Sequence, residues 1–204
     1  MNTLLLISAA GLGLLAFFEP CTIATHTLFA RRANRDTARS RWRALALLLV
    51  SRTVLLAAIF GLAAWIGLHT FSAGVAMLLL GLIGSIYLVT RKIYLPVPHI
   101  EFFRLLPGHA RLAQGLKLGL TLPACTLPLV AVVGFISAFS RRPDIALLAG
   151  VVFASMFSLP TLWDSTRELD AAHRTFLSKA ALISPYLTAV LLWSGAFLIW
   201  KTGI

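Results

Sequence analysis

GLGLLAFFEPCTIATHTLFA, residues 11–30, is an apolar segment long enough to cross a lipid bilayer as a helix. Glu19, Pro20 and Cys21 lie in its middle. Proline lacks a backbone N–H and removes a helical hydrogen bond, so Pro20 predicts a break in the helix. Within lipid, such a break is tolerated only where protein or a water-filled cavity covers it.

The second of the two cysteines lies in a similar segment, GLKLGLTLPACTLPLV, residues 115–130. Cys125 stands there between Pro123 and Pro128. The two segments align when the chain is shifted by 104 residues, with 5 identities in the 16 positions from Gly11 to His26. The two Cys-Thr pairs coincide in this alignment. We therefore predict an internal repeat, with halves of about 1–95 and 108–204, within one membrane domain over 1–204.

The composition is that of an integral membrane protein. Of the 204 residues, 59% are hydrophobic and only 12% are charged, whereas soluble domains carry about 25% charged residues. The net charge of +11 does not indicate nucleic-acid binding, because the basic residues lie in short loops between apolar runs. The start of the chain has no basic region, and its apolar run exceeds signal-peptide length, so we expect a retained span.

The apolar runs predict an all-α protein with six transmembrane helices. Three spans in each half invert the second half relative to the first, which gives a 3+3 inverted repeat with broken first and fourth helices. Such repeats place the working site near the membrane midplane. Arg52 lies inside the second span, and its side chain is expected to extend towards the loop. The predicted spans are 3–30, 44–68, 72–90, 112–138, 145–163 and 180–201.

The distribution of basic residues predicts the orientation in the membrane. Loops one, three and five share one side and, with Arg52 and Lys117, hold 15 of the 18 Lys and Arg residues. The other side holds Arg141, Arg142 and Lys201. Because Lys and Arg are enriched in cytoplasmic loops, both termini are expected on the extracytoplasmic side.

The two cysteines and their neighbours leave three functions open. Thiol–disulfide exchange needs two thiols that can bridge, access for a partner thiol and a means of favouring the thiolate. Backbone N–H groups freed at a Pro-Cys helix start stabilise an anion. Heavy-metal transport through Cys21, Glu19 and His26 is the second function, since thiolates select copper(I) or zinc. The third is a purely structural or small-solute carrier role, in which the prolines act as hinges.

Glu19 is the most distinctive residue of the first span. A carboxyl group at this depth is costly and is a functional-site hypothesis by default. Burial disfavours its charged form. We expect Glu19 either to accept a proton during thiol exchange or to pair with a polar group on a neighbouring helix. His26, five residues after Cys21, does not share its helical face and is expected near the cytoplasmic boundary.

The motifs Pro20-Cys21-Thr22 and Cys125-Thr126-Leu127-Pro128, with the six-span pattern, resemble the CcdA family and the membrane domain of DsbD, the cytochrome c biogenesis transmembrane region. The chain departs from the family pattern at Ala24, which stands where the first motif usually has a second proline. Ala124 likewise precedes the second cysteine in place of proline. Glu19 is also unusual before Pro-Cys.

This resemblance implies a thiol:disulfide oxidoreductase-like relay in the bacterial inner membrane. It implies that cytoplasmic thioredoxin donates electrons and that an extracytoplasmic thioredoxin-like protein accepts them for cytochrome c maturation or disulfide reduction. Neither an organic cofactor nor a metal is expected. The site residues are then Cys21 and Cys125 as the redox-active pair, Pro20 and Pro128 as their flanking prolines, and Glu19.

Overall fold

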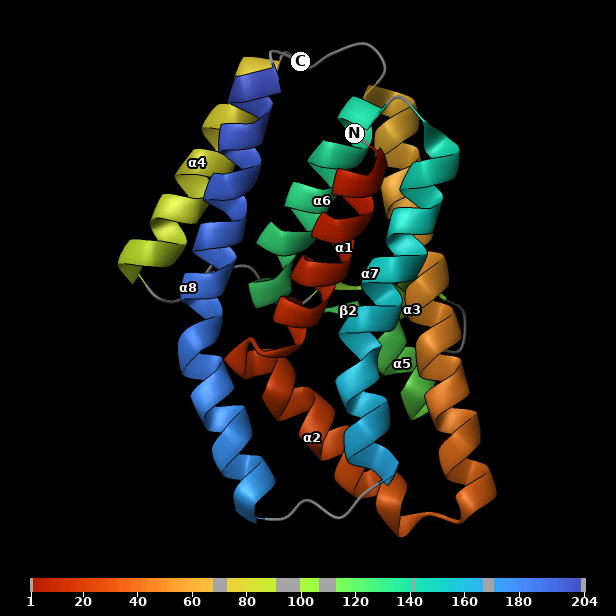
Figure 1. Ribbon diagram of the computed structural model, residues 1–204. Coiled ribbons are helices and arrows are strands. Elements are labelled where there is room, and N and C mark those ends of the chain that lie inside the picture. Colours follow the sequence, from red (N-terminus) through yellow and green to blue (C-terminus); the bar gives the residue numbers. More distant parts are fainter. Residues whose placement is uncertain are drawn as a thin grey trace.

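The computed structural model describes residues 2–67, 73–90, 100–106, 113–140, 142–166 and 171–202. Within these ranges the chain is almost entirely helical, with one pair of two-residue strands (Figure 1). Arg141, named above among the basic residues of the second side, falls outside the described ranges. The elements in chain order are α1 (Asn2–Phe17), α2 (Pro20–Arg35), α3 (Ala38–Ile66), α4 (Ala73–Thr90), β1 (Ile100–Glu101), η2 (Phe102–Leu105), α5 (Gln114–Gly119), β2 (Thr121–Leu122), η4 (Ala124–Thr126), α6 (Leu127–Ser140), α7 (Pro143–Thr166) and α8 (Ala171–Thr202).

The helices are those of an all-α membrane protein, as the composition predicted. Three stretches are long and apolar enough to cross a bilayer: Ala38–Ile66, Pro143–Thr166 and Thr175–Phe197. The pair Leu5–Phe17 and Cys21–Arg35 makes a fourth span if the two are taken together, although they are bent by 72°. The expected number of six spans stays a prediction.

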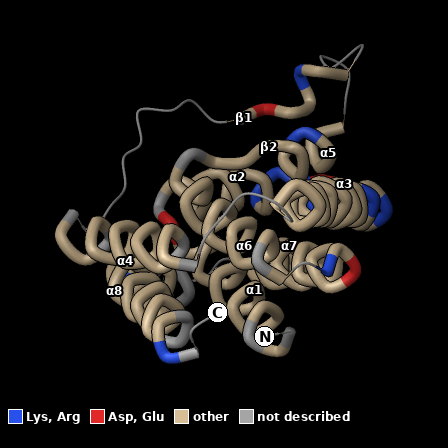
Figure 2. Tube along the Cα trace, turned by 90° about the horizontal axis from the view of Figure 1, so that it is seen from above, with Lys and Arg blue, Asp and Glu red and all other residues tan. Residues whose placement is uncertain are grey.

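Two long helices, α3 and α7, form the centre of the bundle. α7 packs against both α1 and α2, whereas α3 packs against α5 and α6 and against α7 itself. α4 and α8 pair with each other and stand beside this group, as the view along the bundle shows (Figure 2). The pair α1 and α2 therefore lies along α7, and the pair α5 and α6 lies along α3.

Aromatic side chains fill the core between the central helices and α1. Phe60 of α3 meets Phe153 of α7 edge to face, with ring centroids 5.7 Å apart. Leu12 and Phe17 of α1 are buried in the same cluster. The helices approach closely because Gly150 of α7 faces the backbone of α3, where a Cβ atom would lie 2.6 Å from the Ala57 nitrogen.

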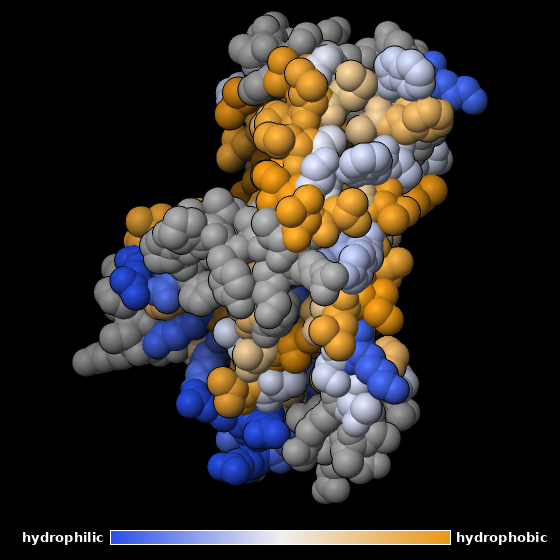
Figure 3. Space-filling model, turned by 90° about the vertical axis from the view of Figure 1, so that its left-hand side faces the viewer, coloured by the Kyte–Doolittle hydropathy of each residue, from blue (hydrophilic) through white to orange (hydrophobic). Residues whose placement is uncertain are grey.

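The outer surface is apolar over most of its height. Trp65 of α3 and Val190 of α8 are largely exposed, at 67% and 65%, and such extended apolar surface marks contact with a membrane. Hydrophilic residues gather at the lower end of the face in Figure 3, the end at which α2 meets α3 in Figure 1. The exposed basic residues of this end are Arg31, Arg32, Arg35, Arg39 and Arg43.

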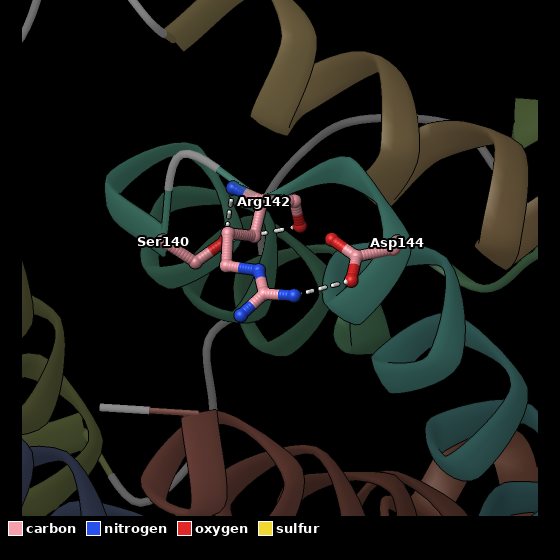
Figure 4. A network of polar contacts seen from close by, with 3 residues as sticks. All are labelled: Ser140, Arg142 and Asp144. Atoms are coloured by element: carbon pink, nitrogen blue, oxygen red, sulfur yellow. Dashed lines mark hydrogen bonds and ion pairs between the residues drawn. The ribbon is translucent and has the colours of Figure 1, made fainter.

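Polar residues gather where α6 ends and α7 begins (Figure 4), at the end of the bundle where α1 starts (Figure 1). Arg142 donates to the Asp144 carboxylate at 2.9 Å, and its backbone N–H donates to the Ser140 hydroxyl at 3.4 Å. The ion pair is exposed, so it contributes little to stability. Its place in the first turn of α7 puts the negative charge of Asp144 near the positive end of the helix dipole.

Candidate functional site

The first helix break lies immediately before Cys21. α1 ends at Phe17, and Glu19 takes an extended conformation, with φ −64° and ψ 135°. Pro20 opens α2 at a position where the N–H has no partner within the helix, so proline costs nothing there. The axis then turns by 72°. The break predicted at Pro20 is present, and it puts Cys21 in the first turn of a helix.

The second break separates α5 from α6 and holds Cys125. After α5 ends at Gly119, β2 pairs with β1 in antiparallel fashion, with Leu122 opposite Ile100. This pairing uses backbone groups that a helix break leaves free. Cys125 follows in η4, where the backbone N–H and the hydroxyl of Thr126 both donate to the Pro123 carbonyl, at 2.9 and 2.8 Å.

The two cysteines meet at these breaks and form a disulfide. Cys21 and Cys125 are 104 residues apart in sequence, and their Cα atoms are 6.9 Å apart. This separation lies just above the usual range for disulfides, about 4.4–6.8 Å. The Thr22 hydroxyl lies 3.7 Å from the Cys125 sulfur, so the Cys-Thr pair of one segment contacts the cysteine of the other.

Pro20 and Pro128 both lie in the first turn of a helix, Pro20 before its cysteine and Pro128 after it. Pro20 is the first residue of α2, and Pro128 is the second residue of α6. Each therefore lies in the first turn of the helix that begins at its cysteine-bearing break, where a missing N–H removes no intrahelical bond. Both prolines therefore lie where a helix starts close to a cysteine.

Glu19 lies inside the protein, next to the bridge in sequence. Only 4% of its surface is exposed. Although it is the N-cap residue of α2, its side chain makes no capping hydrogen bond, and its Oε1 atom has no hydrogen-bond partner among the described residues. The pairing with a polar group on a neighbouring helix that we considered is thus not seen at this oxygen. A buried polar atom without a partner calls for an explanation in catalysis or solvent access.

Arg52 and His26 are fully buried together, which corrects the expectation for Arg52. Arg52 does not extend towards a loop: one terminal nitrogen, Nη2, lies 3.1 Å from His26 Nε2 and donates to the Leu118 carbonyl at 3.2 Å. The other, Nη1, donates to the Ser158 hydroxyl at 3.2 Å. His26 is buried inside the bundle, with Nδ1 2.5 Å from the Thr161 hydroxyl, and its depth near the cytoplasmic boundary stays a prediction.

The contacts of Arg52 settle the proton positions on the His26 ring. Arginine can only donate, so His26 Nε2 is the acceptor and Nδ1 carries the proton. Nδ1–H then donates to Thr161. Phe157 completes the site: its ring stacks on His26 at 5.4 Å between centroids and lies 4.2 Å below the Arg52 guanidinium. This polar cluster, Arg52 with His26, Ser158 and Thr161, draws on α2, α3 and α7.

Sequence reasoning missed this polar cluster, although a signal for it was present. An arginine within an apolar span is a functional-site hypothesis by default, and Arg52 was assigned instead to the membrane boundary. The hydroxyls of Ser158 and Thr161 had no sequence signal of their own, because single hydroxyls are common in transmembrane helices.

A cleft lies between α2 and α5, the helices that flank the two cysteines in sequence. Its volume is about 440 Å³. Thr25 lies one helical turn after Cys21 and donates to the Cys21 carbonyl at 3.1 Å, while Thr121 lies four residues before Cys125. Arg32 and Lys117 make the lining basic. The full lining is Thr25, Leu28, Phe29, Arg32, Gln114, Lys117, Leu118 and Thr121.

The residues weighed for metal binding do not converge. Both ring nitrogens of His26 are engaged, with Arg52 and Thr161, and Cys21 is bridged to Cys125. Across the described ranges, no group of three His, Cys, Asp or Glu side chains is placed to hold a metal ion.

The position of α5 depends on a glycine contact that we expect to be sensitive to substitution. A Cβ atom at Gly115 would overlap the Ala44 carbonyl of α3 and lie 2.8 Å from its carbon. We expect Gly115→Ala to lower the free energy of unfolding by about 1–3 kcal/mol, because backbone cannot yield as a side chain does. Thermal unfolding in detergent measures this.

Gly134→Ala is the matched control for this substitution. A Cβ atom at Gly134 in α6 would meet no described atom within 4 Å, and alanine is favoured over glycine in helices by roughly 0.5–1 kcal/mol. The control should unfold at the wild-type temperature or above it. Equal midpoints for the two variants would contradict the close packing of α5 on α3.

Together the fold and site define an all-α membrane protein with a bridged cysteine pair at two helix breaks. Comparison of the chain with protein-family models, with curated proteins and with solved structures found no match.

Proposed function

We propose that the protein is a thiol–disulfide electron relay. In this proposal it takes reducing equivalents from cytoplasmic thioredoxin and passes them across the bacterial inner membrane to an extracytoplasmic thioredoxin-like protein. The acceptor then serves cytochrome c maturation or disulfide reduction, as the resemblance to the CcdA and DsbD membrane proteins implies. One observation carries the proposal: the two cysteines, 104 residues apart in sequence, form a bridge where two helices break.

The chemistry is two successive dithiol–disulfide exchanges. A donor thiolate attacks one sulfur of the Cys21–Cys125 bridge, forms a mixed disulfide and releases the other cysteine as a thiolate. The donor's second thiol resolves the mixed disulfide, so the donor leaves oxidised and the relay holds two thiols. One of these thiols then attacks the acceptor disulfide, the other restores the bridge, and the acceptor leaves reduced. Two electrons and two protons move in each cycle, and no organic cofactor is needed.

The surroundings of each cysteine favour this chemistry. Cys21 lies at the start of α2, where free backbone N–H groups and the helix dipole stabilise a thiolate. The cleft between α2 and α5 offers a partner thiol an approach beside both cysteine segments. Glu19 is buried, and its Oε1 atom has no partner among the residues that the structure describes. It would accept the proton that a thiol releases when it becomes the attacking thiolate.

We further propose that the chain is a 3+3 inverted repeat of six spans, with halves of about 1–95 and 108–204. The packing supports this arrangement. α7 of the second half packs against α1 and α2 of the first, and α3 of the first half packs against α5 and α6 of the second, while α4 pairs with α8. An exchange of the two halves leaves this pattern unchanged. In such repeats, rocking of one half against the other exposes a central site to either side.

The proposed orientation places both termini outside the cytoplasm. The exposed arginines at the α2–α3 end support it, because cytoplasmic loops are enriched in Lys and Arg. The basic lining residues Arg32 and Lys117 then lie on the cytoplasmic side of the bridge, where the donor would approach.

A thiol-trapping experiment tests the proposed function directly. Membranes containing the protein are treated with an alkylating reagent of large mass, before and after addition of reduced thioredoxin. We expect the untreated protein to resist the reagent, because its cysteines are bridged, and to gain two reagent molecules after thioredoxin acts. Two thiols that are free at the outset, or a bridge that thioredoxin leaves intact, would refute the relay.

A further inference from the structure

The Arg52 guanidinium links the two segments that carry the cysteines. Its Nη2 atom contacts His26, which lies on α2 with Cys21, and also the carbonyl of Leu118, which lies on α5 ahead of Cys125. One nitrogen atom therefore joins α2 to α5 a short way along the chain from the bridge. Nη1 fastens the same group to Ser158 on the central helix α7.

This arrangement is costly for stability. Arg52 is fully buried, and no carboxylate of the described residues forms an ion pair with it. Its Nε atom has no hydrogen-bond partner there. Burying a charge without an opposite charge is expensive even when hydrogen bonds compensate part of the cost. Packing alone gives no reason for a guanidinium at this place.

We propose that Arg52 is a positioning residue that keeps the two thiols within bridging distance when the disulfide is open. This inference rests on the proposed relay and adds a residue to it. In the oxidised protein the bridge itself ties Cys21 to Cys125. In the dithiol state that covalent tie is absent, and the contacts of Nη2 with His26 and Leu118 remain to hold α2 against α5.

The consequence is a change in how readily the bridge closes. Closure of the bridge is intramolecular, so its equilibrium depends on the effective concentration of one thiol at the other. A link that holds the segments together raises this concentration and favours the disulfide. Loss of the link therefore favours the dithiol, and the reduction potential of the pair becomes less negative.

The experiment is a redox titration of the purified protein in lipid nanodiscs with mixtures of reduced and oxidised glutathione. The dithiol is oxidised to the bridge while oxidised glutathione is reduced to two thiols, so electrons and protons balance. We expect Arg52→Gln to lower the equilibrium constant for bridge formation about tenfold, which corresponds to about 30 mV for two electrons. Arg52→Lys should show a similar loss, since a single ammonium group does not reproduce the fork of contacts.

Two further variants keep the test decisive if Arg52 variants fold poorly. His26→Phe keeps an aromatic ring beside Phe157 but removes the acceptor on α2, so it should shift the equilibrium in the same direction by several-fold. Ser51→Ala is the matched control, because Ser51 is buried and next to Arg52 in sequence, and among the described residues its hydroxyl donates to the Leu47 and Leu48 carbonyls of its own helix. The control should titrate as the wild type does.

The outcomes separate the two proposals. If the wild type forms no reversible bridge with glutathione, the relay itself is wrong, and the role of Arg52 falls with it. If the wild type titrates normally and His26→Phe matches Ser51→Ala, the relay stands and the positioning role is refuted. An Arg52→Lys variant with the wild-type equilibrium would also overturn the role, because it would show that charge alone suffices.

Discussion

Replacement of either cysteine by serine should abolish electron transfer across the membrane. Each sulfur of the Cys21–Cys125 bridge is a nucleophile or a leaving group in the proposed cycle, and serine serves as neither with a disulfide. Loss of a catalytic nucleophile costs orders of magnitude in rate. We expect transfer from reduced thioredoxin to an extracytoplasmic disulfide reporter to fall by at least about a thousandfold in proteoliposomes.

The single-cysteine variants should still react with a partner thiol, unlike membranes that lack the protein. The remaining thiol can still form a mixed disulfide with a partner, but no second cysteine is present to resolve it. Non-reducing gels should therefore show a trapped adduct with a thioredoxin variant that keeps only its attacking cysteine. Reduced wild-type protein is the control for folding. It lacks the bridge as the serine variants do, and loss of the disulfide lowers the stability of both. Undiminished transfer by Cys21→Ser or Cys125→Ser would contradict the relay and favour a carrier in which the cysteines are dispensable.

Glu19→Gln should slow thiol exchange without preventing the bridge. Glutamine keeps the shape of the side chain and its capacity for hydrogen bonds but cannot accept a proton as a carboxylate does. General acid–base catalysis typically contributes about 10²–10⁴-fold, and we expect a loss near the lower end of that range. The expression level, the unfolding temperature and the bridged fraction of the resting protein should match the wild type.

The pH dependence distinguishes a proton acceptor from a packing residue. Thiolates form without help at high pH, so the rate of Glu19→Gln should approach that of the wild type as the pH rises. The deficit should be greatest around neutral pH, which makes the variant's pH profile steeper. Glu19→Asp, which keeps the acid, is the matched control and should recover part of the rate. A rate and a pH profile unchanged in Glu19→Gln would leave Glu19 a structural role only.

The sequence was sufficient for features that depend on the residues themselves. Apolar runs predicted an all-α membrane protein, because hydrophobicity belongs to the side chains whatever the fold. Pro20 predicted the break between α1 and α2, because the missing N–H is a local property of proline. The matching Cys-Thr pairs likewise predicted an internal repeat, which stays a prediction.

The tertiary structure alone decided how close the two cysteines lie and where the Arg52 side chain points. The separation of 6.9 Å between the Cys21 and Cys125 Cα atoms depends on how α2 and η4 pack, which no local pattern encodes. The direction of Arg52 was decided in the same way. A long cationic side chain in an apolar helix reaches water when nothing else receives it, but here His26, Leu118 and Ser158 receive it inside the bundle. Those acceptors come from three other helices, so only their assembly turns the side chain inward.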